Sequence, residues 1–302
     1  MKPVTTSNRN RARDNLARLT FGRDSLICHE ARNFGQARQE LFVATYMAMR
    51  MIDDHVDHQP ACDRGPESPT LARIASWREN IRTAASGIAP GTHDPLEADI
   101  LFELSRTLPG ADLGPRPWDA LALAMRADAL GQLMPTFEDF LAYAEGATVA
   151  PTYVFTWLLA ADDSTCNLSS NTSNEEIWDL ARPLGISCYL THIMRDLVQD
   201  ARAGHNLLTI PRELWDDLSD DREALASRLA GEGAREVIIL RHRLFERLST
   251  FANATNEARN RLMQILAPEN QLILKRILAH YANCAIQMTS SRGNERHIRA
   301  ET

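Results

Sequence analysis

The chain has 302 residues with a formal net charge of −7, and 44% of its side chains are hydrophobic. This length suffices for one large domain with a buried cavity or for two ordinary domains, and the acidic excess excludes a nucleic-acid partner, which would need a basic surface. The five cysteines include no C-x-x-C pair, so neither a disulfide framework nor a zinc site is indicated, and a reducing cytoplasm fits.

The two ends of the chain are polar. The segment MKPVTTSNRNRARDN lacks the apolar core of a secretory signal. We therefore expect residues 1–14 and 291–302 to be disordered tails around one domain at residues 15–290. No window approaches 18 uncharged apolar residues, so the chain is expected to be soluble, with peripheral membrane contact left open.

Apolar residues recur at helical spacing along most of the chain. In the first long block, residues 36–58, the series that contains Leu41, Ala48, Ile52 and Val56 advances in steps of three and four. Further helices are predicted at residues 71–86, 96–107, 117–131, 136–160, 174–201, 221–252 and 256–290. Loops rich in Gly, Pro, Ser, Asn or Asp are predicted at residues 58–70, 86–95, 108–117 and 162–174. No alternating strand pattern is convincing, so the sequence predicts an all-α fold.

One proline lies within a predicted helix. Pro151 falls in the segment 136–160, and a proline inside a helix removes one backbone hydrogen bond and kinks the axis. The freed carbonyl would widen a tunnel beside this helix. The same residue is equally compatible with a helix end.

Two predicted helices carry pairs of aspartates near their ends. RMIDDHVDH places Asp53 and Asp57 one turn apart with Asp54 adjacent, and MRDLVQDAR repeats the spacing with Asp196 and Asp200. Like charges at this spacing weaken a helix unless a cation lies between them. This conflict between charge and local structure indicates a functional site, although spacing alone leaves open two solvated acidic faces.

Carboxylate pairs suit a particular chemistry. A hard divalent cation such as Mg²⁺ is commonly shared between one or two carboxylates and a substrate phosphate. Two such helices facing across a cavity would hold cations around a diphosphate. These cations would neutralise the charge that develops on the diphosphate as its bond to the allylic carbon breaks. The allylic cation then needs a dry apolar wall. The predicted metal ligands are Asp53, Asp54, Asp57, Asp196 and Asp200.

Other functional side chains accompany the aspartates. Arg50 and Arg195 are candidates for binding diphosphate oxygens, or else for salt bridges within their helices. Tyr46 lies on the helical face of the first aspartate pair, where it is either a catalytic cavity residue or a core tyrosine. His192 precedes the second pair by one turn and is expected to shape the pocket rather than to bind metal.

The two segments together resemble the squalene/phytoene synthase family, the head-to-head branch of the trans-isoprenyl diphosphate synthases. YMAMRMIDDHVD is similar to the family pattern Y-x-x-x-R-x-x-D-D-x-x-D, and ARPLGISCYLTHIMRDLVQDARAG is similar to A-R-x-L-G-x-x-x-Q-x-x-N-I-x-R-D-x-x-E-D-x-x-x-G. Asp128, which stands 15 residues before Tyr143, and Tyr281 resemble cavity residues of the family. The resemblance extends over about residues 22–285.

The resemblance implies both a fold and a reaction. The fold would be a class I isoprenoid synthase-like helical bundle around a central cavity. The reaction would be a Mg²⁺-dependent condensation of two allylic prenyl diphosphates, farnesyl or geranylgeranyl, through a cyclopropyl diphosphate. NADPH would be needed only if the product is squalene.

Several residues depart from the family pattern around the acceptor. Tyr189 and His192 stand where the family usually has Gln and Asn, Gln199 replaces a Glu, and His205 stands where an arginine is common. These departures leave two alternatives with the same metal site: a prenyltransferase with a non-isoprenoid, for example aromatic, acceptor, or a terpene cyclase acting on a single prenyl diphosphate. A non-catalytic helical protein that binds lipid or a partner is a third.

Overall fold

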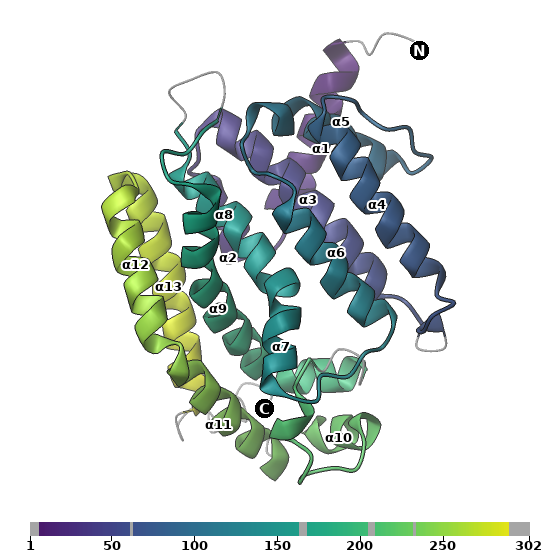
Figure 1. Cartoon of the computed structure of the whole chain (residues 1–302), viewed down its shortest axis with the longest axis vertical. Coiled ribbons are helices and arrows are strands. Elements are labelled where there is room, and N and C mark those ends of the chain that lie inside the picture. Colours follow the sequence, from purple (N-terminus) through teal and green to yellow (C-terminus); the bar gives the residue numbers. More distant parts are fainter. Residues whose placement is uncertain (1–5, 61–62, 163–167, 205–208, 232–233, 290–302) are drawn as a thin grey trace.

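Amphipathic helices make up the fold, which confirms the predicted all-α class (Figure 1). This computed structural model describes residues 6–60, 63–162, 168–204, 209–231 and 234–289, in which there are two isolated β-bridges but no strand. The helices are α1 (Thr6–Phe21), α2 (Leu26–Ala31), α3 (Gln36–Asp57), α4 (Pro69–Ala85), α5 (Pro95–Thr107), α6 (Arg116–Ala129), α7 (Phe137–Ala144), α8 (Ala150–Ala160), α9 (Asn174–Ala203), α10 (Arg222–Leu229), α11 (Arg235–Thr250), α12 (Ala252–Ile265) and α13 (Pro268–Thr289). Short 3₁₀ turns cover Leu108–Gly110 and Arg212–Leu214.

Polar caps determine where several helices begin. The side chains of Ser68, Asp94 and Ser173 accept hydrogen bonds from backbone N–H groups in the first turns of α4, α5 and α9. Thr136 and Asp139 form a reciprocal capping box at the start of α7. Local sequence therefore specifies the starts of these helices, including α9, which carries the second aspartate pair.

A π-helical turn at Glu145–Val149 joins α7 to α8 within the predicted helix 136–160. The N–H of Ala150 donates to the carbonyl of Glu145 in this turn. Pro151, at the start of α8, has no N–H with which to continue the regular pattern. The proline thus neither ends the helix nor only bends it, because the chain passes through one wider turn and continues as α8.

Two predicted helices are each divided in two. The segment 221–252 forms α10 and α11, and Gly231, a residue with low helix propensity, lies in the break. The segment 256–290 forms α12 and α13, since Pro268 lacks the N–H that would continue α12. Helical spacing continues across both breaks, and for this reason periodicity alone predicts one helix in each case.

The predicted N-terminal tail is also too long. Helix α1 begins at Thr6, so part of the segment 1–14 that we expected to be disordered is helical. Ala12 and Leu16 are buried against the rest of the bundle, which explains why this polar segment is ordered. Residues 1–5 and the tail expected at 291–302 lie outside the described residues.

The two helices that carry the aspartates are central to the bundle. Helix α3 packs against α1, α5, α6 and α8, and α9 packs against α8 and α10 to α13. Figure 1 shows α4 and α6 on one side of the molecule and α12 and α13 on the other. Helix α8 contacts both α3 and α9, and side chains from the last turns of α3 and α9 line one cavity.

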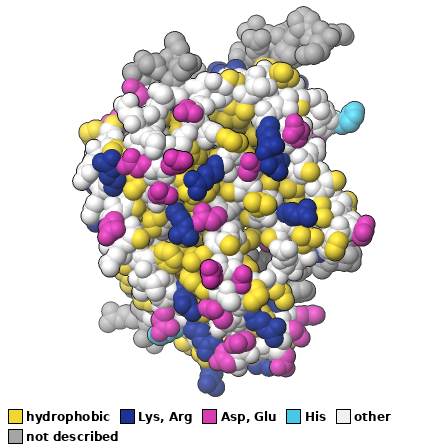
Figure 2. Space-filling model, viewed as in Figure 1, with side chains coloured by type: hydrophobic (Ala, Val, Ile, Leu, Met, Phe, Trp, Pro, Cys, Tyr) yellow, Lys and Arg dark blue, Asp and Glu magenta, His cyan; other side chains and the backbone are white. Residues whose placement is uncertain are grey.

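The surface in Figure 2 carries both signs of charge. On this face the arginine and lysine side chains are interspersed with acidic and apolar ones, without a continuous basic patch. Within the described part of the chain, no helix is both long enough and apolar enough to cross a bilayer.

Gly146 allows α6 to approach the π-helical turn closely. A β-carbon at this position would lie 2.1 Å from the carbonyl oxygen of Ala120 and 2.8 Å from the β-carbon of Ala124. We expect Gly146→Ala to lower the free energy of unfolding by about 1–3 kcal/mol, because an added methyl group in a packed interior forces backbones apart. Urea denaturation followed by circular dichroism measures this change.

The matched control is Gly91→Ala. Nothing lies within 4 Å of a β-carbon added at Gly91, so this substitution should change the free energy of unfolding by less than about 0.5 kcal/mol. Equal destabilisation by Gly91→Ala and Gly146→Ala would contradict the close approach of the two helices.

Candidate active site

The two aspartate pairs line one cavity, here called the aspartate chamber. Asp53 and Asp57 reach it from the end of α3, and Asp196 and Asp200 reach it from the end of α9. The chamber has a volume of about 380 Å³. Helices far apart in the sequence therefore present four carboxylates to the same space.

Burial and mutual repulsion act on most of these carboxylates. Burial and then the charge of Asp57 raise the pKa of Asp53 to about 6. Burial and then the charge of Asp196 raise the pKa of Asp200 to about 6, and burial raises the pKa of Asp57. The side chains of Asp57 and Asp200 have no hydrogen bond or ion pair with any described residue. A bound cation would relieve this repulsion.

Asp196 differs because it has strong donors beside it. Burial raises its pKa, but the hydrogen bonds from Arg195 and the imidazole of His192, whose Nδ1 lies 3.9 Å from Asp196, outweigh burial and lower the pKa to about 2. Arg195 donates to Asp196 at 2.6 Å, and its Nη2 lies 2.8 Å from Nδ1 of His192. His192 Nε2 lies in turn 2.6 Å from the hydroxyl of Tyr281. Arg195 and Tyr281 do not line the chamber themselves, and they act on it through Asp196 and His192.

Arg50 organises the other side of the chamber. Its Nη1 donates to Asp53 at 2.5 Å, and its Nη2 donates to Asp54. Arg23 also pairs with Asp54, at 3.4 Å. Asp54 is thus held by two arginines and does not line the chamber, unlike the other predicted metal ligands. The geometry makes it a partner of Arg50.

A fifth carboxylate, Asp128 of α6, also lines the chamber. The hydroxyl of Tyr143 donates to it at 2.8 Å, and burial raises the pKa of Asp128 to about 7 although this hydrogen bond lowers it. Tyr189 stacks on Phe140 with ring centroids 5.8 Å apart, and its hydroxyl donates to Thr209 at 3.2 Å. Asp128, Tyr143, Tyr189 and Thr209 form a hydrogen-bonded wall of the chamber.

An apolar pocket of about 290 Å³ adjoins the chamber. Its walls include Ile27, Phe42, Met49, Leu121, Val154 and Phe155. Tyr46 lines this pocket rather than the chamber, and its ring stacks on Phe42 with centroids 5.5 Å apart. The residues that line both spaces are Arg50, Asp53, Ala147, Tyr189 and His192. A polar space and an apolar space therefore meet at these side chains.

The carboxylates fit a hard divalent cation that is shared with a ligand. Among the described residues, no three His, Cys, Asp or Glu side chains are close enough together to hold a metal ion alone. Mg²⁺ usually keeps several waters and binds through one or two carboxylates together with substrate phosphates. Asp57 and Asp200 offer oxygens that no described arginine occupies. The fit is to cations completed by a diphosphate rather than to an enclosed metal.

Two further residues line the chamber without any sequence pattern that points to them. Arg64 follows α3 in a loop, and Thr209 precedes the 3₁₀ turn. Loop residues carry no periodicity, so only the tertiary structure brings them to the site. His205, whose identity departs from the family pattern, lies outside the described residues.

Comparison with known proteins assigns the fold and the family. A solved dehydrosqualene synthase in complex with ligand has a TM-score of 0.66 and 13% sequence identity, with 94% of this chain and 85% of that chain covered. This likeness shows a shared isoprenoid synthase fold. No curated protein matches the chain. The family model for squalene/phytoene synthases matches residues 31–288, most of the chain. The protein therefore belongs to the squalene/phytoene synthase family, a family of prenyl transferases, as its two aspartate segments imply.

Proposed function

We propose that this protein is a Mg²⁺-dependent transferase that condenses two allylic prenyl diphosphates head-to-head. The observation that carries the proposal is the meeting of carboxylates from α3 and α9 in one chamber with an apolar pocket beside it. A prenyl diphosphate has a charged head and an apolar tail, and the two adjoining cavities have matching chemistry. Membership of the squalene/phytoene synthase family supports the reaction class.

The metal ligands in this proposal are Asp53, Asp57, Asp196 and Asp200. Cations held there would neutralise the charge that develops on a departing diphosphate. Asp196 is already ionised because its pKa is low. Asp57 and Asp200 have no described partner that a cation must displace.

Arg50 is the proposed diphosphate-binding residue. It lines both the chamber and the apolar pocket, and its Nε is buried without a partner among the described residues. A guanidinium donates two parallel hydrogen bonds to a phosphate in a fixed geometry. Arg195, which was predicted for the same role, lies outside the chamber and keeps Asp196 ionised instead.

The apolar pocket would shield the allylic carbon from water. The rings of Phe42, Tyr46 and Phe155 line it, and aromatic faces attract a positive charge placed over them. The proposed substrates are farnesyl or geranylgeranyl diphosphate, joined through a cyclopropyl diphosphate. NADPH enters only if the final product is squalene. We place the protein in the cytoplasm, and release of an apolar product would favour contact with a membrane surface.

The size of the apolar pocket favours a second candidate function. Its volume of about 290 Å³ lies just below the range of about 300–1,000 Å³ for small-molecule pockets, which suits one prenyl chain better than two. Tyr189 and His192, which depart from the family pattern, line both cavities. The alternative is therefore a terpene cyclase that acts on one prenyl diphosphate, or a prenyltransferase with a non-isoprenoid acceptor.

Product analysis tests the proposed reaction. We expect the purified protein, incubated with farnesyl or geranylgeranyl diphosphate and Mg²⁺, to give a linear dimeric hydrocarbon or a cyclopropyl diphosphate, identified by mass spectrometry. A cyclic monomeric terpene would instead establish the cyclase. Absence of turnover with every prenyl diphosphate supplied alone would favour the non-isoprenoid acceptor.

Substitution of the proposed ligands tests the metal site. We expect Asp53→Asn and Asp196→Asn each to lower kcat by about 100-fold or more, because each removes a charge that stabilises the cations around the leaving group. Steady-state release of pyrophosphate measures the effect. Asp179→Asn is the matched control, since Asp179 lies on α9 but is exposed, and it should retain full activity. Wild-type kcat in Asp53→Asn would refute the assignment.

The raised carboxylate pKa values predict an unusual dependence of stability on pH. Asp53 and Asp200 have pKa values of about 6 and Asp128 of about 7 in the folded state. The folded protein thus takes up protons that the unfolded chain does not bind until about pH 4, so the free energy of unfolding should rise as pH falls from about 7.5 to about 5. Thermal unfolding in EDTA measures this trend.

A double variant isolates the two carboxylates. Asp53→Asn with Asp200→Asn should weaken the rise in stability on acidification. The low pKa of Asp196 stabilises the fold above about pH 4 and falls outside this interval, and the lowered pKa of His55 acts in the opposite direction but is the same in both proteins. Identical pH profiles for the wild type and the double variant would contradict the predicted charge repulsion.

A further inference from the structure

A cavity of about 490 Å³, here called the outer pocket, lies on another side of His192. Its lining residues come from the turn before α2, from α2 itself and the residue after it, and from α9 and α13. Most of these side chains are exposed: Arg23, Asp24, His29, Arg32, Arg195 and His280. The outer pocket is therefore a polar space that faces the solvent, with more basic than acidic side chains.

His192 stands where three cavities meet. It lines the outer pocket, the aspartate chamber and the apolar pocket, and no other described residue lines all three. Ile27 of α2 is the second residue that the outer pocket shares with the apolar pocket. These two side chains therefore form the wall between a solvent-facing space and the apolar pocket.

The imidazole ring of His192 is held at both of its nitrogens. Nδ1 lies 2.8 Å from Nη2 of Arg195, and Nε2 lies 2.6 Å from the hydroxyl of Tyr281. The ring of Tyr281 also packs against it, with centroids 5.0 Å apart. Arg195 is fixed in turn by two hydrogen bonds to Asp196. A side chain whose polar atoms all have partners keeps one rotamer, so His192 forms a fixed part of the wall.

A wall at this place matters to an allylic cation, because the cation reacts with water as well as with a double bond. Capture by water forms a bond between the water oxygen and the allylic carbon and releases one proton to the solvent, which leaves a prenyl alcohol. A bound diphosphate and its cations would occupy the chamber, and the outer pocket would still bring solvent to the wall of the apolar pocket. Reactive intermediates survive in sites from which water is excluded.

We propose that His192 keeps the water of the outer pocket away from the allylic cation, so that the cation reacts with a double bond instead of forming an alcohol. This role rests on the proposed function, since it requires an ionised prenyl diphosphate. His192 acts by its position and is not itself a reacting group. Its ring is larger than the asparagine that is usual in the family at this position, so it fills more of the wall.

Thiol labelling tests the wall without catalysis. Met49→Cys places a thiol in the apolar pocket, because Met49 lines this pocket and is buried. The reagent is a methanethiosulfonate that carries a sulfonate, an anion that the aspartates repel and the arginines of the outer pocket attract. We expect His192→Ala, added to Met49→Cys, to raise the labelling rate at position 49 by about tenfold or more, since a buried thiol otherwise reacts only during local opening. Mass spectrometry of the peptide that contains position 49 measures the rate.

His29→Ala is the matched control, because His29 is exposed and lines the outer pocket but neither of the other two cavities. It enlarges the outer pocket without opening the wall, so the labelling rate should not change. Circular dichroism checks folding, and His192→Asn carries the test if His192→Ala does not fold. Equal labelling rates with His192 intact and with either substitution at this position would overturn the proposal.

Product analysis in water enriched in a heavy oxygen isotope gives a second measurement. With farnesyl diphosphate and Mg²⁺, we expect His192→Ala to raise the amount of heavy-oxygen alcohol per pyrophosphate released by about tenfold, because water then reaches the cation. Heavy oxygen in the alcohol marks capture at carbon, since hydrolysis at phosphorus leaves the original oxygen in place. An alcohol as the main product of the wild type, or an unchanged ratio in His192→Ala, would overturn the proposal. If no pyrophosphate is released, the proposed function fails, and the labelling rates alone decide whether His192 separates the two spaces.

Discussion

The constraint on which the rest of this structure depends is the confinement of like charge. Five carboxylates from α3, α6 and α9 line one chamber, and such an arrangement opposes folding unless protons or cations compensate it. Burial and the repulsion between these carboxylates raise the pKa values of Asp53, Asp57, Asp128 and Asp200. The surrounding helices must hold the charged turns together against this repulsion, and α8, which contacts both α3 and α9, lies at the centre of that support.

The same confinement gives the site its polarity. Arginines offset only part of the charge: Arg50 pairs with Asp53, and Arg195 with Asp196. Asp57 and Asp200 are left facing the chamber without described partners. In the adjoining apolar pocket, the walls are aromatic and aliphatic. A ligand with a charged head and an apolar tail thus has one orientation in which both parts meet favourable surroundings.

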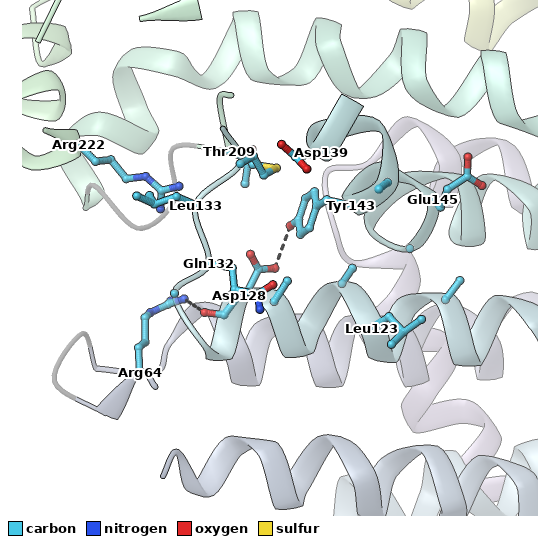
Figure 3. A pocket seen from close by; sticks show the side chains of 17 residues that line it. Arg64, Leu123, Asp128, Gln132, Leu133, Asp139, Tyr143, Glu145, Thr209 and Arg222 are labelled. Atoms are coloured by element: carbon cyan, nitrogen blue, oxygen red, sulfur yellow. Dashed lines mark hydrogen bonds between the residues drawn. The ribbon is translucent and has the colours of Figure 1, made fainter. Parts of the chain in front are cut away.

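The hydrogen bond between Asp128 and Tyr143 forms part of one wall of the chamber. A further cavity of about 350 Å³, lined by residues of α6 and α7, shares both side chains with the chamber (Figure 3). Both cavities are lined by side chains of each sign, and Arg64 and Asp128 line both.

Much of the site follows from local sequence, and the remainder depends on tertiary contacts. The spacing of Asp53 with Asp57 and of Asp196 with Asp200 is visible along the chain because helical periodicity is a local property. The segments that meet across the bundle are not encoded by spacing, so the different places of Asp54 and Arg195, outside the chamber, were not predictable.

Side-chain partners set similar limits elsewhere. Tyr281 contributes through His192 rather than by lining the chamber, and Arg64, which does line it, comes from a loop in which no periodicity predicts its place. Pro268 shows the opposite limit. It interrupts the helix predicted at residues 256–290, but the apolar spacing continues on both sides of it, so periodicity alone does not reveal the break.

The most direct test is to locate bound cations. Crystals grown with Mn²⁺ and an unreactive prenyl diphosphate analogue, measured for anomalous scattering, should show metal peaks between the ends of α3 and α9, with carboxylates of both helices and the diphosphate as ligands. Peaks confined to one helix, or a diphosphate bound without metal in the chamber, would contradict the account.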